Sequence, residues 1–336
     1  MTTRRDFMKT AAAGVGAATL GTAGATEAAA PNSGPRQMPR GLTLLSMLQA
    51  DGNETLGVKL SNGVLDVASA GKALKIDAPL TLEALLASGN AASLEQLISA
   101  AKDRREFLKD EASIKFGRLF TNPGKIVCVG LNYKEHAEEA GEKLPKEPIL
   151  FNKYNNTLAA HQCTIKLPPR EISYKFDYET ELLIVIGKTA RNVSEAEALD
   201  HVAGYAVGHD FSARDLQLEK GGQWMVGKTL DGFAPIGPYF VSADLVDPNN
   251  LTIETFVNDE EQPRQSSNTS KFIFNPQKVI SYASRLFALE PGDIIFTGTP
   301  SGVIIGMPKD KQVWLKPGDR ITSRIEKLGS LKFDLA

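Results

Sequence analysis

Runs of apolar residues at strand or helix spacing mark most of the secondary structure of this chain. From Gly41 to about Phe116, short β-prone runs such as LTLLSML and LGVKL are separated by glycine-containing turns. Two later segments, LTLEALLASG and AASLEQLISAAKDRREFL, carry apolar residues at helical spacing, and Gly89 is a suitable end for the first helix. The pattern predicts a small N-terminal α+β domain over residues 41–118.

The rest of the chain, residues 121–336, is richer in strand patterns. KIVCVG predicts a buried strand, and further strands are expected at PYFVSA, LTIETFVND and KFIF and in the two regions that follow Pro-Gly-Asp turns. Two longer helices are predicted, at NVSEAEALDHVAG, with Ser194 as N-cap and Gly204 at its end, and at NPQKVISYASRLFAL. Residues 212–238 lack periodicity and predict a long functional loop. The fold class is therefore α+β, mostly β.

One strand, DYETELLIVIG, carries two carboxylates at its start. Strand side chains alternate between faces, so Glu179 and Glu181 point the same way as Leu183 and Val185. Two neighbouring carboxylates repel each other and need either water or a cation. The spacing by itself leaves two interpretations open: a solvated strand edge or part of a metal site.

A third acid, Asp210, ends the next apolar run, GYAVGHD. If it converges on Glu179 and Glu181, the three supply only hard oxygen ligands. Such ligands suit Mg²⁺, Mn²⁺ or Ca²⁺ better than zinc or copper.

Four further residues are candidates for chemistry. His136 and Glu139 lie three residues apart in the helix-prone KEHAEEAG, so they share a face, and an acid beside an imidazole orients it as a general base. Lys153 follows an apolar run, and Lys228 lies between a glycine and a threonine in the predicted loop. Each has an ordinary alternative, because exposed helices and loops often carry such polar side chains without a function.

Composition narrows the function classes, and the N-terminus predicts a location. A formal net charge of -2 gives no electrostatic reason for nucleic-acid binding. Residues 1–30 combine Arg4 and Arg5 with an Ala/Gly-rich apolar run that ends in small residues, which indicates a twin-arginine signal peptide. Residues 31–40 predict a linker. We expect a periplasmic or otherwise exported protein that uses the twin-arginine export machinery and has no membrane segment after cleavage.

Seven motifs in order resemble the fumarylacetoacetate hydrolase family. They are LNYKEHAEEAG, ILFNK, DYETELLIVIGK, GYAVGHDFSARDLQ, QWMVGKTLDGFAPIGP, LEPGDIIFTGTPSGV and LKPGDRITSRIEKLGSL. The resemblance covers about Lys125 to the C-terminus, and the smaller N-terminal domain is similar to that of longer bacterial members. It implies a mixed β-sandwich roll, usually a homodimer.

The resemblance also implies roles for individual residues. The family's divalent metal, Mg²⁺ or Mn²⁺ in most members and Ca²⁺ in some, would be held by carboxylates at Glu179, Glu181 and Asp210. The motif positions put catalytic roles at His136, Glu139 and Lys228, and substrate binding at Lys153, Arg214, Gln217 and Thr299.

The activity implied is metal-dependent hydrolysis of a C–C bond in a small 1,3-dioxo or 2-oxo acid, such as an acylpyruvate or a fumarylacetoacetate-like compound, through an enolate. Two alternatives stay open. One is an isomerase or decarboxylase acting on a 2-hydroxymuconate-type or oxaloacetate-like substrate, and the other is a non-catalytic exported binding protein. Residues 159–162 and 303–306 depart from the family pattern at positions expected to lie near the substrate, so a relative's substrate does not identify the substrate of this chain.

Overall fold

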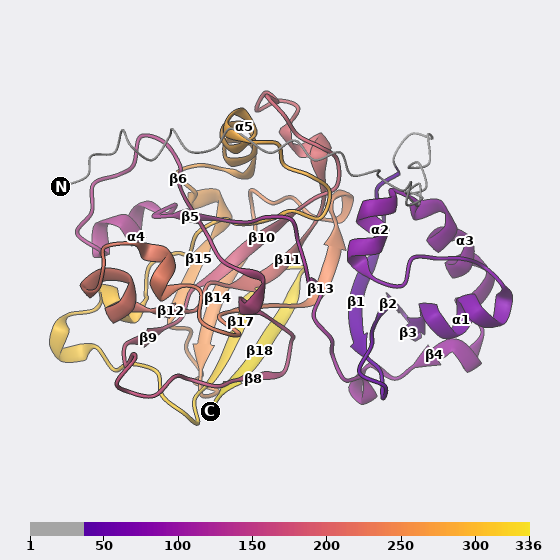
Figure 1. Ribbon diagram of the computed structural model, residues 1–336, viewed down its shortest axis with the longest axis horizontal. Helices are drawn as coiled ribbons and strands as arrows, with labels where there is room; N and C mark the ends of the chain where they lie inside the picture. Colours follow the sequence, from indigo (N-terminus) through magenta and orange to yellow (C-terminus); the bar gives the residue numbers. More distant parts are fainter. Residues whose placement is uncertain (1–36) are drawn as a thin grey trace, which may run out of the picture. The chain divides into compact units, whose positions relative to one another are not determined.

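Two sheets form the framework of the computed structural model, which describes residues 37–336 (Figure 1). Within these residues the larger sheet has 11 strands. Its strands, in spatial order, are β4 (Leu108–Lys109), β3 (Gly63–Asp66), β2 (Glu54–Leu60), β1 (Thr43–Leu48), β13 (Ala234–Ser242), β11 (Val202–His209), β10 (Thr180–Ile186), β16 (Ile294–Phe296), β5 (Ile126–Gly130) and β6 (Ile149–Asn152), with β7 (Leu158–Ala159) paired to β13.

The second sheet packs against the first. It contains β15 (Gln265–Asn268), β14 (Thr252–Val257), β17 (Arg320–Ile325), β18 (Gly329–Leu335) and β8 (Cys163–Ile165). Strands β17 and β18 contact β11, as Figure 1 shows near the C-terminus. A separate two-stranded pair joins β9 (Phe176–Asp177) to β12 (Ser212–Ala213). The mostly β, α+β class is confirmed, and the arrangement matches the sandwich-like roll that the family resemblance implies.

Strand β10 lies in the interior of the large sheet and is buried along its whole length. Its two faces belong to different cores. Leu182 and Ile184 join the core that faces the second sheet, whereas Leu183 and Val185 join the core that continues into the N-terminal region. The predicted alternation of side chains between the two faces is confirmed for residues 182–185. These four side chains are all apolar because both faces of the strand are covered.

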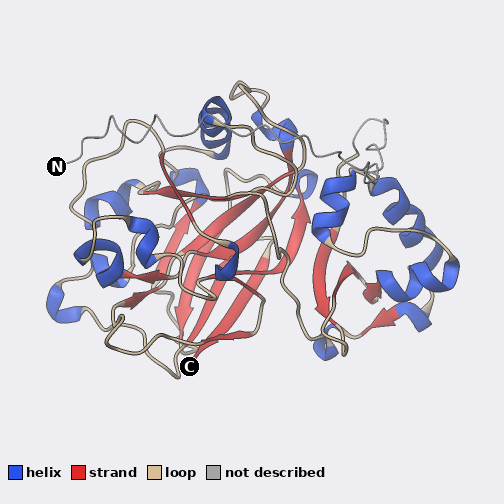
Figure 2. Cartoon of the chain, viewed as in Figure 1, coloured by secondary structure: helices blue, strands red, loops and turns tan. Residues whose placement is uncertain are grey.

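The helices lie around the sheets (Figure 2). They are α1 (Val67–Leu74), α2 (Leu82–Ser88), α3 (Ala91–Ala101), α4 (Lys134–Glu139) and α5 (Pro276–Leu286). Helix α5 begins where the Asn275 side chain accepts the Lys278 N–H and where Pro276, which lacks an N–H, occupies the first turn. Helix α2 ends as predicted at Gly89, whose φ of 60° is the left-handed conformation of a helix C-cap.

The N-terminal strands extend the large sheet. Strand β1 pairs antiparallel with β13, in register Thr43 with Val241, so β1 to β4 continue the sheet that carries β10. The division into domains at residues 41–118 and 121–336 stays a prediction. The predicted signal peptide, residues 1–30, lies outside the described residues, and so do residues 31–36 of the predicted linker.

Three predicted elements were wrong. The helix expected at 192–204 is a single 3₁₀ turn, Ala198–His201, and Gly204 lies inside β11, where pairing with β13 outweighs the helical pattern. The strand expected at KFIF is a 3₁₀ turn, Thr269–Lys271, followed by irregular chain. The predicted loop 212–238 contains a π-helical turn, Asp215–Glu219, and a 3₁₀ helix, Trp224–Gly227, here called η5 and η6.

Over residues 37–336, none of the helices combines the length and the apolar character that crossing a bilayer requires.

Candidate active site

The antiparallel register of β10 and β11 brings three carboxylates together. Thr180 pairs with His209, and the Asp210 N–H donates to the Glu179 carbonyl at 2.9 Å, so Asp210 lies beside Glu179 at the strand ends. Ligand oxygens of Glu179, Glu181 and Asp210 all lie within 4.8 Å of one another, and all three side chains are buried. We refer to these three residues as the acidic cluster. The condition that the sequence left open, convergence of the three carboxylates, is therefore met, and their role as metal ligands stays a prediction.

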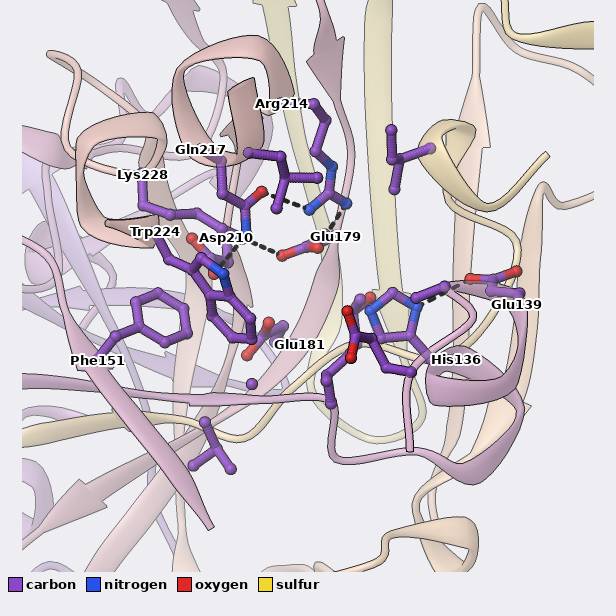
Figure 3. Close-up of a pocket in the computed structure, with 18 residues that line it drawn as sticks. His136, Glu139, Phe151, Glu179, Glu181, Asp210, Arg214, Gln217, Trp224 and Lys228 are labelled. Carbon is purple, nitrogen blue, oxygen red and sulfur yellow. Dashed lines mark hydrogen bonds and ion pairs between the residues drawn. The ribbon is translucent and has the colours of Figure 1, made fainter. Parts of the chain in front are cut away.

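In residues 37–336, three buried cations contact the acidic cluster, and Figure 3 shows two of them, Arg214 and Lys228. The Lys228 ammonium donates to Glu179 Oε2 at 2.5 Å and to Asp210 Oδ2 at 2.8 Å. Arg214 Nη2 donates to Glu179 Oε1 at 2.6 Å, and Lys153 Nζ donates to Asp210 Oδ1 at 2.6 Å. Buried charges need such partners, because transfer of an isolated charge from water into the interior is very unfavourable.

The pKa of Glu179 reflects this pairing. Burial alone would raise the pKa, but the Arg214 guanidinium and the Lys228 ammonium outweigh burial and hold it well below the ordinary glutamate value. The same contacts raise the pKa of Lys228 against the effect of its own burial. Glu179 is therefore an ionised carboxylate in the folded protein.

Glu181 is in a different state. Its Oε2 accepts the Gly298 N–H at 2.6 Å, but within residues 37–336 it has no lysine or arginine partner at salt-bridge distance. Burial, followed by the charges of Asp210 and Glu179, raises the pKa of Glu181 well above the ordinary value. One carboxylate of the cluster thus lacks a compensating cation.

A divalent cation fits this arrangement. The donor atoms are carboxylate oxygens only, which Mg²⁺ and Mn²⁺ prefer, and the uncompensated charge of Glu181 is the charge that such an ion would neutralise. The acidic cluster also faces a pocket and is not enclosed, so an ion there would keep positions open for small ligands.

Helix α4 supplies a histidine and a glutamate on another side of the pocket. His136 Nδ1 lies 2.9 Å from Glu139 Oε1, as their three-residue spacing predicted. A carboxylate accepts hydrogen bonds, so Nδ1 carries the proton and Nε2 is the basic nitrogen. Glu139 is itself fixed by the Gly302 N–H, at 3.0 Å from Oε2 and 3.2 Å from Oε1. The His136–Glu139 dyad is therefore oriented before any ligand binds.

The pocket has a volume of about 160 Å³. Its lining includes the acidic cluster, the dyad, Arg214, Gln217, Lys228 and Thr299, together with an apolar wall that contains Phe151 and Trp224. Gln217 Oε1 accepts from Arg214 Nη1 at 2.9 Å, which leaves the amide NH₂ of Gln217 as a donor. The pocket is smaller than the roughly 300–1,000 Å³ of typical sites for drug-sized ligands, so it suits a small acid.

Two predicted substrate-binding residues have other contacts. Lys153 lies behind Asp210 and is not part of the pocket lining. The Thr299 hydroxyl lines the pocket but donates to the Thr180 carbonyl at 2.9 Å and accepts from Gln265 Nε2 at 2.9 Å. Their assignment to substrate binding stays a prediction.

Sequence reasoning missed Asp177, two residues before Glu179. It is fully buried and accepts from Arg214 Nε at 2.8 Å and from the Ile304 and Ile305 N–H groups at 2.8 and 3.0 Å. It thereby connects Arg214 to the segment that borders the pocket. Its place in DYETE was the available signal, because an acid at alternate spacing shares the face of Glu179.

Comparison with known proteins gives a consistent family assignment. Residues 125–336 match the family described as fumarylacetoacetate (FAA) hydrolase C-terminal. A fumarylacetoacetate hydrolase domain-containing protein 2 homolog from Dictyostelium discoideum is 47% identical over 292 residues, which cover 83% of this chain and 92% of the relative. The mitochondrial oxaloacetate tautomerase fahd2 of Xenopus laevis is 39% identical over 280 residues, 82% of this chain and 84% of that protein.

Two solved structures share the fold. Fumarylacetoacetate hydrolase from Exiguobacterium antarcticum superimposes with a TM-score of 0.69 at 30% identity, over 88% of this chain and 99% of that one. Fumarylpyruvate hydrolase from Pseudomonas aeruginosa, solved with Mn²⁺ and pyruvate, has a TM-score of 0.57 at 33% identity, over 64% of this chain and 91% of that one. The chain therefore belongs to the fumarylacetoacetate hydrolase family and is an enzyme that acts on enolisable oxo-acids or on their C–C bonds.

Proposed function

We propose that this enzyme interconverts the enol and keto forms of a small 2-oxo diacid of the oxaloacetate type, with a divalent metal in the acidic cluster. The observation that carries the proposal is the buried carboxylate of Glu181, which has no lysine or arginine partner among residues 37–336 and faces the same small pocket as an oriented histidine. The choice of a tautomerase is supported by the relatives at 39 to 44% identity that are named oxaloacetate tautomerases.

Mg²⁺ or Mn²⁺ is the ion that the donor set favours, and Ca²⁺ is a third candidate. When bound by Glu179, Glu181 and Asp210, it would polarise the oxygen atoms of the substrate and favour the enolate form. The three carboxylates contribute ligand atoms, and the surrounding cations limit the negative charge that the ion must offset.

His136 is the proposed proton carrier. Tautomerisation moves one proton between the enol oxygen and the carbon next to the one that bears this oxygen, so it needs one base that can return the proton to a different atom. Nε2 of His136 is the basic nitrogen, and Glu139 stabilises the imidazolium after it has taken the proton. Lys228 supplies positive charge close to the developing enolate oxygen.

Arg214 and Gln217 are proposed to bind a substrate carboxylate. Both line the pocket, and the hydrogen bond between them fixes the guanidinium and the amide side by side. A guanidinium matches the geometry of a carboxylate, and the amide NH₂ adds a neutral donor.

Hydrolysis of an acylpyruvate is the second candidate. It is supported by the structural similarity to a fumarylpyruvate hydrolase solved with Mn²⁺ and pyruvate. In that reaction His136 Nε2 would accept a proton from water as the water attacks the distal carbonyl carbon. The bond between that carbon and the methylene carbon would then break, which releases a carboxylic acid and the enolate of pyruvate, and the enolate carbon would take up the proton.

A single experiment distinguishes these activities. Enol oxaloacetate and a set of acylpyruvates are supplied to the Mn²⁺-loaded enzyme, while enol absorbance, pyruvate and CO₂ are followed separately. Loss of enol absorbance without pyruvate supports a tautomerase, pyruvate with a carboxylic acid supports a hydrolase, and pyruvate with CO₂ supports a decarboxylase. Absence of turnover with every compound would contradict the proposal.

Export and assembly complete the proposal. The paired Arg4 and Arg5 support twin-arginine export, and replacing both with lysine should keep the precursor in the cytoplasm in a fractionation assay. The family resemblance supports a homodimer, and light scattering of the purified protein would test this assembly.

A further inference from the structure

The apolar wall of the pocket is built around Trp224. This residue begins η6, and Lys228 directly follows the end of that helix, so one short segment supplies both an apolar wall residue and a site cation. Its ring meets Phe151 edge to face, with centroids 6.0 Å apart and an interplanar angle of 78°. Figure 3 shows this aromatic pair on one side of Glu181 and His136 on the other.

The indole of Trp224 lies directly on Gly130. A Cβ atom at position 130 would lie 2.5 Å from Trp224 Cζ3, 3.3 Å from Cη2 and 3.4 Å from Cε3. Gly130 is absent from the positive-φ positions of residues 37–336, so its backbone conformation suits any residue type. The space taken by the ring therefore accounts for glycine at this position.

The two sides of the pocket differ in chemistry. The acidic cluster, Arg214 and Lys228 attract the charged oxo-acid group, whereas Gly130, Leu131, Phe151 and Trp224 offer no charge. If the charged side holds the oxo-acid group of a substrate, the uncharged wall is the side left for its remaining atoms. With a pocket of about 160 Å³, those atoms must be few.

We infer that Trp224, seated on Gly130, sets the maximum length of the substrate beyond its oxo-acid group. This inference rests on the proposed function and adds a substrate class to it: short 2-oxo and 2,4-dioxo acids are accepted, and longer acyl chains are excluded by the indole. Trp224 acts here as a specificity-determining residue and takes no part in proton transfer.

The test uses two opposite changes. Trp224→Ala removes the ring and should raise kcat/KM for long acylpyruvates, such as hexanoylpyruvate, relative to acetylpyruvate by about ten-fold or more, because each added methylene in an apolar pocket is worth about that factor. Gly130→Ala should displace the ring into the pocket and lower kcat/KM for short substrates. In the double variant the ring is gone, so the Gly130→Ala loss should largely disappear. Additive effects in the double variant would overturn the inference, and so would an unchanged length preference in Trp224→Ala.

A binding measurement separates this inference from the proposed function. Trp224 and Trp314 are the two tryptophans of the sequence. Trp314→Phe leaves Trp224 as the sole indole and also serves as a matched control, because Trp314 is not part of the pocket lining. Fluorescence titration of this Mn²⁺-loaded variant with the acylpyruvate series should show weaker binding as the chain lengthens.

The same series is measured with Mn²⁺-loaded Trp224→Ala by calorimetry, where the decline with chain length should be lost. If no compound is turned over but the two length profiles differ, the inference holds and the proposed function fails. If enol oxaloacetate is converted to its keto form and the two length profiles are identical, the inference fails and the proposed function holds. Absence of binding at every chain length would contradict both.

Discussion

Two groups of paired charges in this chain use similar residues with different results. At the N-terminal region, the Lys59 ammonium contacts Glu111 and the Tyr239 hydroxyl, both at 2.7 Å. We call this group the N-terminal ion pair. It balances one carboxylate with one cation, and its charged side chains are about one-third exposed, 37% for Lys59 and 32% for Glu111. The acidic cluster and its cations are almost fully buried.

The buried group is also unbalanced. Four carboxylates there meet three cations, so one negative charge remains: the carboxylates are Asp177, Glu179, Glu181 and Asp210, and the cations are Lys153, Arg214 and Lys228. Removing one member of a surface ion pair changes the free energy of unfolding little. An excess charge in the interior must instead be neutralised by a bound ion or by a proton. The difference teaches that burial and charge count, more than residue type, separate a candidate metal site from a structural ion pair.

The largest expected effect comes from Glu181→Gln. The substitution removes the uncompensated charge and so weakens binding of a divalent ion. Turnover should fall by about 10³-fold, because a bound metal lowers the activation free energy by several kcal/mol. Mn²⁺ titration by calorimetry should show weakened binding. In the metal-free protein the variant should be as stable as the wild type or more stable, and clear destabilisation would contradict the charge count.

Glu179→Gln should have the opposite effect on the metal-free protein. The change leaves Arg214 and Lys228 with one fewer negative partner in a buried site, which costs about 3 kcal/mol of the free energy of unfolding. Denaturant unfolding in the presence of a chelator measures this loss. Equal stability of the metal-free Glu179→Gln and Glu181→Gln variants would contradict the conclusion that only Glu179 is stabilised by buried cations.

His136→Asn should lower kcat by about 10²-fold, the usual contribution of a positioned general base. Metal affinity should stay close to wild type, because His136 is outside the acidic cluster. Glu139→Gln is the milder partner variant and should lower kcat less. A His136→Asn protein that keeps full activity would remove the dyad from the proposed reaction.

The smallest effect is expected at the N-terminal ion pair. Burial raises the pKa of Glu111, but hydrogen bonds from Lys59 and Tyr239 outweigh it and lower the pKa below its ordinary value. The stabilisation is therefore complete above the pKa of the unfolded chain and is lost as pH falls through the lower pKa of the folded state.

For this reason Glu111→Gln should cost less than about 1 kcal/mol at neutral pH and nothing in strong acid, with kcat/KM unchanged. Thermal unfolding at a series of pH values measures the difference between wild type and variant. A large loss of activity would contradict the contrast between the two groups.

Local patterns predicted much of the fold. The two-residue period of a strand correctly placed Leu182 and Leu183 of LLIVI on opposite faces. Helices α2 and α5 lie where capping residues and helical periodicity indicated. Pattern reasoning failed at residues 192–204, because a capping signature is a local preference and the pairing of β11 with β13 is a tertiary one.

The sequence by itself determined the kinds of donor atom in the site and the spacing within each motif. Glu179 and Glu181 share a face, and His136 contacts Glu139, because both relations are set by the geometry of one strand or one helix turn. The tertiary structure decided which cation pairs with which acid, since Lys153 and Asp210 are 57 residues apart and Lys228 and Glu179 are 49 apart.

Tertiary packing likewise decided that Glu181 accepts the Gly298 N–H and has no cation partner within the described part of the chain, and that Trp224 lies on Gly130. Such pairings arise when distant segments are packed together, and the periodicity of a single segment carries no information about them.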